Sequence, residues 1–223
     1  MENSFDKWTA EIKKVNGDNL VSVIRHGENS VLVLLGELNF NNLIENSKLA
    51  GKMQSKGIVP LYLTGEYIKT SCDVYPLEYL KMKRSYKVLY GKNILDKLEI
   101  PSENIRLECE QKIKGALIRL TQVILESGKN MRKLRRASFL ALEDILAGIE
   151  GILELSGISG QFSPAVLIEN MQQKFSVDLK PLKDVLNWKN GTKPDDFKKL
   201  VHDFYEKIEE IAGLADRFNT GGR

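Results

Sequence analysis

The chain has 223 residues, of which 42% are hydrophobic and 28% charged, and its formal net charge at pH 7 is +3. This length is enough for one large domain or two small domains with a real hydrophobic core. The net charge is too small to indicate nucleic-acid binding by itself, so only local clusters of charge are informative about a partner. No apolar run approaches the roughly 20 residues of a membrane-spanning helix, so no membrane partner is expected.

The first hundred residues are predicted to form a small mixed sheet with helices. The helical spacing of Phe5, Trp8 and Ile12 predicts a first helix, and two apolar, β-rich runs follow it. The second run has no polar interruption, which is typical of a strand covered on both faces. The elements expected in order are a helix over 4–15, strands over 20–24 and 31–35, a helix over 40–56 and a strand over 59–63.

Two further strands are predicted before the chain becomes helical. Leu77 and Tyr79 alternate with Glu78 in the first, and a second alternation covers residues 86–90. The same stretch contains a cluster of cations with no acid between them, formed by Lys81, Lys83, Arg84, Lys87 and Lys92. We expect a local positive field there.

The remainder of the chain is predicted to be a bundle of amphipathic helices whose short loops make neighbours antiparallel. Helices are expected over 101–128, 130–155, 163–174 and 179–188, with a last one from 194 to about 215. The expected fold class is therefore α+β. It combines an α/β domain over 1–100, an all-α bundle over 101–218 and a flexible tail over 219–223.

One local pattern resembles a known family. Residues 59–91 contain P-L-Y-L-T, then S-x-D-V-Y-P-L-E-Y-L-x-x-K, then L-Y-G. This resembles a prokaryotic group of nucleotidyltransferase-like proteins, in which a minimal polymerase-β-type domain precedes a helical bundle. The resemblance implies that fold, and the chemistry has to be argued separately.

Active members of the resembled group place a Gly-Ser turn after the first strand and two acids on the second strand, where they hold divalent metals. In this sequence Gly27 is followed by Glu28, and Asn29 and Ser30 stand where a partner carboxylate is expected. Lys81 stands where a third acid is expected on the third strand, and a charged lysine cannot bind a metal. The chain therefore resembles a catalytically degenerate member, unless a loop is missing from the short 25–30 segment.

Three functions remain in competition at this point. The leading hypothesis is a nucleotide-binding or regulatory module that keeps the fold and has no metal site. The second is an active Mg²⁺-dependent nucleotidyltransferase that transfers a nucleoside monophosphate from an NTP, with Glu28 and Glu78 as the remaining catalytic acids. The third is a structural protein whose bundle pairs with a second copy or with another chain.

The candidate nucleotide-binding residues are Gly27 in the turn and cations from two clusters. Lys83 and Arg84 belong to the cluster described above, whereas Arg132 and Arg136 belong to a second one at the start of a long helix, together with Lys129, Lys133 and Arg135. Cations at a helix N-terminus oppose the macrodipole, so helix stability does not explain this second cluster. A phosphate group would explain it, and so would a solvated basic surface. Nucleic acid is the less favoured partner but stays open, because few aromatic residues lie between the cations.

Two cysteines, Cys72 and Cys109, lack metal-binding spacing and suggest a reducing compartment. The first residues lack the basic start and apolar centre of a signal peptide. A cytoplasmic protein is therefore expected.

Overall fold

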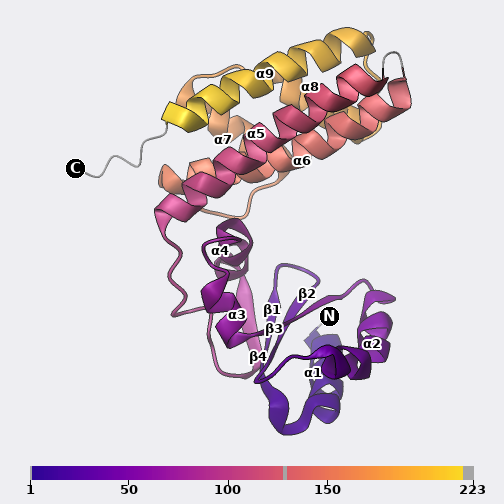
Figure 1. The fold of residues 1–223 in the computed structure, drawn as a ribbon, viewed down its shortest axis with the longest axis vertical. Coiled ribbons are helices and arrows are strands. Elements are labelled where there is room, and N and C mark those ends of the chain that lie inside the picture. The colour runs from indigo at the N-terminus through magenta and orange to yellow at the C-terminus, as the bar shows by residue number, and fades with distance from the viewer. Residues whose placement is uncertain (1, 128–129, 218–223) are drawn as a thin grey trace, which may run out of the picture. The chain divides into compact units, whose positions relative to one another are not determined.

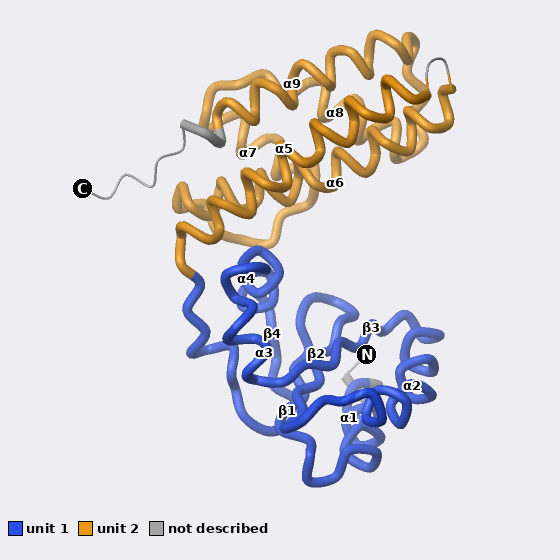
Figure 2. Tube along the Cα trace, viewed as in Figure 1, with its two compact units in different colours: residues 1–100 blue, residues 101–223 orange. Residues whose placement is uncertain are grey.

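The computed structural model describes residues 2–127 and 130–217. It divides into two compact units, Met1–Ile100 and Pro101–Arg223, which Figure 2 shows in different colours. The predicted tail over 219–223 and residue Lys129 lie outside the described residues. None of the helices in the described ranges is long and apolar enough to cross a membrane.

The first unit is built on a tight β-hairpin. Its strands are β1 (Leu20–His26) and β2 (Ser30–Leu35), which pair antiparallel as far as His26 and Ser30. The residues Gly27, Glu28 and Asn29 form the turn between the two strands. The hairpin predicted from the short, glycine-containing connection is therefore present.

Two more strands complete a four-stranded mixed sheet with the order β3-β2-β1-β4. Strand β3 (Val59–Thr64) runs parallel to β2, because helix α2 (Phe40–Gln54) carries the chain across between them. Strand β4 (Tyr86–Gly91) runs antiparallel to β1 at the other edge. Figure 1 shows how the sheet lies between α1 (Glu2–Asn16) and α2 on one side and α3 (Gly65–Thr70) and α4 (Pro76–Arg84) on the other.

Both faces of the sheet are covered by hydrophobic packing. Val23 and Val33 point to the side where Phe5 and Ile12 of α1 and Met53 of α2 are buried. Ile24 and Leu32 point to the opposite side. There they pack with residues of α3, of the turn after it, of α4 and of the segment that follows β4, namely Ile68, Cys72, Tyr79, Met82, Leu95 and Leu98. The central strands are therefore sealed from water by two separate clusters.

The prediction of a strand after Pro76 is wrong, because this segment forms helix α4. Pro76 occupies the first helical turn, where its missing N–H costs nothing. The buried residues are Pro76, Leu77, Tyr79 and Met82. Pro76, Tyr79 and Met82 recur at intervals of three residues, which fits one face of a helix. Over so few residues, alternation of apolar and polar side chains does not distinguish the two structures.

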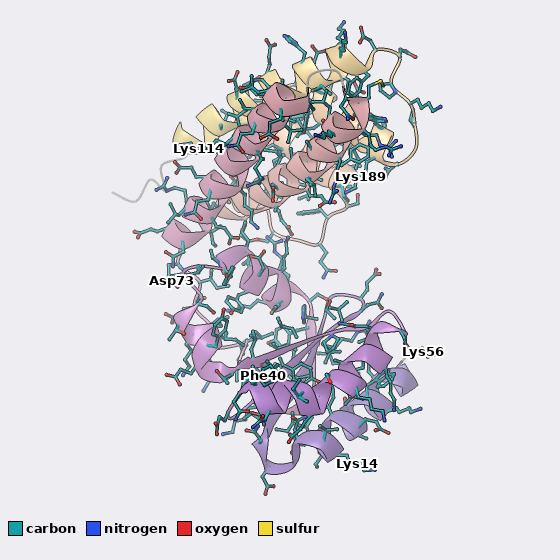
Figure 3. All side chains as sticks on the ribbon, turned by 45° about the vertical axis from the view of Figure 1, so that its right-hand side comes forward. Lys14, Phe40, Lys56, Asp73, Lys114 and Lys189 are labelled. Carbon is teal, nitrogen blue, oxygen red and sulfur yellow. The ribbon has the colours of Figure 1, made fainter. Side chains whose placement is uncertain are left out.

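The α+β fold class is confirmed. The second unit contains the predicted helices. They are α5 (Ser102–Ser127), α6 (Met131–Leu155), α7 (Pro164–Phe175), α8 (Lys180–Lys189) and α9 (Phe197–Arg217). Helices α5 and α6 pack closely along their length, and Gly148 of α6 lies directly against the side chain of Ile113. Ion pairs also join the helices: Lys189 of α8, labelled in Figure 3, binds Glu143 of α6.

Gly91 at the end of β4 provides a test of how closely β4 lies against β1. Its φ is +79°, and an added Cβ would lie 2.0 Å from the Val21 carbonyl oxygen, whereas Gly57 has a φ of +76° and open space around it. Gly57→Ala should therefore lower the free energy of unfolding by about 1–2 kcal/mol, which is the cost of a left-handed alanine. Gly91→Ala should lower it by at least about 2 kcal/mol more, because its Cβ also clashes with the backbone of β1. Urea denaturation followed by circular dichroism measures both, and equal losses would contradict the packing described.

Candidate functional site

The fold places the candidate site at the turn between β1 and β2. Gly27 adopts a left-handed conformation with φ +58°, and its amide donates a hydrogen bond of 3.0 Å to the Ser85 carbonyl between α4 and β4. On the other side, the Asn29 carbonyl accepts a bond of 2.9 Å from the Val59 amide at the start of β3. The predicted phosphate-binding amide of Gly27 is thus already used within the protein.

Strand β2 leaves this turn as an entirely apolar strand. From Val31 to Leu35 every residue is hydrophobic and at most 1% exposed. A carboxylate at any of these positions would be buried without water, at a cost of several kcal/mol (~2–7 for an unpaired polar group and more for a charge). The strand that carries the metal-binding acids in the resembled enzymes therefore carries none here.

The two predicted catalytic acids come from different elements. Glu28 is exposed at the tip of the turn, and its carbonyl accepts a hydrogen bond of 3.1 Å from the Arg25 guanidinium. Glu78 is half-buried in the first turn of α4, where the helix dipole favours an acid. Among the described residues, no group of three His, Cys, Asp or Glu side chains is placed to hold a metal ion.

Helix α4 provides a structural reason for three cations of the first cluster. Lys81, Lys83 and Arg84 occupy its last turn, where cations complement the negative end of the helix dipole. The Lys83 ammonium donates a hydrogen bond to the Leu98 carbonyl, so it takes part in holding the segment after β4. Lys81 is therefore not on a third strand as predicted. Arg84 immediately precedes Ser85, whose carbonyl holds the hairpin turn.

Two side chains at the end of β1 lie beside this turn. The Arg25 guanidinium packs over the Phe5 ring with 4.5 Å between its carbon and the ring centroid. His26 is half-buried, and its buried Nε2 has no hydrogen-bond partner in the described structure. Burial lowers the pKa of His26 because desolvation disfavours the charged ring. This buried histidine could not be identified from the sequence, because its burial depends on segments distant in the chain.

The second cationic cluster lies on the first turns of α6 in the other unit. Asn130 caps this helix by accepting a hydrogen bond of 3.2 Å from the Lys133 amide, and no acid occupies the first turn. Arg132 and Arg136 are both exposed. Arg136 lines a groove between α5 and α6, together with Lys133 and Arg119, whereas Arg132 does not.

Comparison with known proteins was informative about the fold. A crystal structure of a spectinomycin adenyltransferase from Enterococcus faecialis, determined with ATP and spectinomycin, superimposes with a TM-score of 0.52. The alignment covers 91% of this chain and 97% of that chain, at 11% sequence identity. The fold is nucleotidyltransferase-like. The prediction from residues 59–91 is thus confirmed at the level of fold.

Sequence comparisons add nothing further. No protein-family model matches the chain, and no curated protein is similar to it in sequence. At this low identity the structural similarity shows the fold alone. The chemistry of this nucleotidyltransferase-like fold must therefore be judged from its own residues.

The lowered pKa of His26 predicts that the stability of the protein depends on pH. Because its pKa is lowered in the folded state, the unfolded state binds the proton first, and the folded state loses stability as the pH falls from the usual value of 6.5 through the lowered pKa. His26→Gln should flatten this dependence of the free energy of unfolding between about pH 7.5 and pH 5. Urea denaturation across that range measures it.

The other histidine, His202, is exposed on α9 and serves as the matched control. His202→Gln should keep the loss of stability that His26 causes. If His26→Gln retains the slope of the wild-type protein, His26 is not the group responsible and its burial does not couple to folding.

Proposed function

We propose that the protein is a non-catalytic nucleotide-binding or regulatory module with a nucleotidyltransferase-like fold. The observation that carries this proposal is the closed β1–β2 hairpin. Its turn is held by hydrogen bonds from the Gly27 amide to the Ser85 carbonyl and from the Val59 amide to the Asn29 carbonyl, and β2 continues as a buried apolar strand. Residues 31–35 are all buried and hydrophobic, so they provide no metal-bearing acid pair.

Nucleotidyl transfer depends on charge neutralisation at the reacting phosphoryl group, which carboxylate-bound metal ions normally supply. Glu28 is the only acid in the turn, and it is exposed at its tip. Glu78 lies in the first turn of α4, where its negative charge interacts favourably with the helix dipole. We assign neither glutamate a metal-binding role, so the alternative of an active transferase has no acid cluster to support it among the described residues.

Nucleotide binding without catalysis is supported by two observations. The protein of similar fold was solved with ATP. In this chain, Arg84 lies next to the residue that holds the hairpin turn, and arginine binds phosphate through paired N–H groups without a metal. In this proposal a guanidinium replaces the metal ion as the partner of the phosphates, so binding should not need magnesium.

Calorimetric titration with ATP, GTP, CTP and UTP, each with and without Mg²⁺, tests the proposal. We expect at least one nucleotide to bind with an affinity that changes less than about threefold when Mg²⁺ is removed. Arg84→Gln should weaken binding about tenfold, equivalent to ~1.4 kcal/mol. The control Lys92→Gln removes an exposed cation of the same cluster and should change the affinity less than about twofold.

The double variant Glu28→Gln/Glu78→Gln separates the proposal from the active-enzyme alternative. Its affinity for the nucleotide with Mg²⁺ should equal that of the wild-type protein, because neither carboxylate holds a metal. Binding that requires Mg²⁺ and is lost in the double variant would overturn the proposal and restore the transferase.

A second candidate function, pairing with a second copy through the bundle, has its own observation. Leu125 of α5 is 79% exposed, and Ile118, one heptad earlier, is 58% exposed. Leu125 borders an apolar groove of about 380 Å³ between α5 and α9, which also contains Phe197, Val201 and Tyr205. Exposed apolar residues at heptad spacing are typical of a helix that packs against another helix.

Light scattering coupled to size exclusion tests this pairing. The candidate predicts a dimer whose fraction rises with concentration, and Leu125→Lys should convert it to a monomer. Leu107→Lys changes an exposed leucine of the same helix that does not line the groove, and it should leave the dimer intact. A wild-type protein that is monomeric at every concentration would remove this candidate.

A further inference from the structure

The groove between α5 and α6 combines an apolar floor with cationic walls. Its floor includes Ala116, Leu120 and Ala141, and its cations are Arg119, Lys133 and Arg136. Its volume of about 420 Å³ falls within the range of small-molecule sites, which is roughly 300–1,000 Å³. Both walls belong to the second unit, so the groove does not depend on the hairpin.

The floor of the groove is formed by the contact between the two long helices. Ala116, Leu120 and Ala141 are at most 4% exposed, and small side chains at two of these positions let the helices approach closely. Leu140 is 51% exposed and lines the same groove. A ligand that lies on this floor would cover the side chain of Leu140 and gain apolar contact.

The cations at the walls differ in how they are used. Arg119 forms an ion pair with Asp144 across the two helices, so its charge is largely balanced. Lys133 and Arg136 have no ion-pair partner within residues 2–127 and 130–217, and both lie in the first two turns of α6. Glu126 is the single acid in the lining.

The position of Lys133 and Arg136 is electrostatically unfavourable in the protein alone. Lys133 lies in the first turn of α6, where a cation opposes the helix dipole at some cost, and Arg136 follows in the second turn, where this effect is weaker. The first turn contains no acid that would offset this cost. An anion between these two side chains would interact favourably with both charges and with the helix terminus.

We propose that this groove binds a small amphipathic anion. Its anionic group contacts Lys133 and Arg136, and its apolar ring system lies on Leu120, Val123 and Leu140. Nucleoside monophosphates and aromatic carboxylates share this chemistry. The site is independent of the nucleotide binding proposed at the hairpin, because it uses no residue of the first unit.

Fluorescence titration with 1-anilinonaphthalene-8-sulfonate, an aromatic sulfonate, tests the site on the full chain. We expect saturable binding of one probe molecule, weakened by added salt because the charges are exposed. Arg136→Gln should raise the dissociation constant at least about fivefold. Arg132→Gln is the matched control, since Arg132 is exposed one helical turn earlier but does not line the groove, and it should change the constant less than about twofold.

A second variant separates loss of the site from loss of folding. Leu140→Glu adds a negative charge at a half-exposed position, so it should abolish binding of the probe while the far-UV circular dichroism and the urea midpoint stay unchanged. Equal effects of Arg136→Gln and Arg132→Gln would identify the cluster as a solvated basic surface and overturn the proposal. Full binding to Leu140→Glu would overturn it too, because the probe would then lie elsewhere.

Competition identifies the source of the anion. Displacement of the probe by AMP but not by benzoate assigns the groove to nucleotides, and the reverse assigns it to aromatic carboxylates. Either result supports the proposal, and displacement by neither contradicts it. Failure here is distinguishable from failure at the hairpin, because Arg84→Gln reports on the first unit and Arg136→Gln on the second.

Discussion

Strand β2 is enclosed on both faces, and much of the first unit follows from this constraint. Its side chains alternate between the cluster under α1 and α2 and the cluster under α3 and α4, so neither set can be charged. The same strand is where the resembled enzymes hold metal-binding acids. A tight turn at Gly27 then joins β2 to β1, and its amide is bound to Ser85. The tight hairpin and the absence of acids from residues 31–35 are therefore two aspects of one packing arrangement.

Helix α4 accounts for the cations that lie at its C-terminal end. On a strand, Lys81, Lys83 and Arg84 would be a cluster without a structural reason. At the end of a helix they complement its dipole. The cations of α6 are in the opposite situation, because they stand at the start of a helix whose first turn contains no acid. A bound anion would therefore account for the cations of α6, whereas the helix dipole already accounts for those of α4.

The sequence was sufficient for features that depend on long periodic patterns. The five rear helices and the uninterrupted run of β2 were predicted because each has many residues with the same periodicity. Helix α4 was not, because alternation over Leu77, Glu78 and Tyr79 fits either structure. The short α3, capped by Thr64, gives too few residues for any period.

The candidate site was predictable only in part. The turn at Gly27 and the absence of an acid pair on the strand that follows could be predicted, because both are read from adjacent residues. The sequence could not reveal that the Gly27 amide is occupied by Ser85, nor that His26 is buried, because these contacts join residues far apart in the chain. The same holds for the difference between Arg132 and Arg136, which depends on how α5 packs against α6.

The most direct measurement of the central claim is paramagnetic broadening of backbone amide signals by Mn²⁺ in the presence of a nucleotide. A metal held at the hairpin would broaden the amides of Gly27, Glu28, Asn29 and Ser30 selectively, because the effect falls steeply with distance from the ion. The account predicts that these four signals broaden no more than exposed amides elsewhere in the chain. Selective, saturable broadening at the turn would contradict it and would return the protein to the metal-dependent transferases.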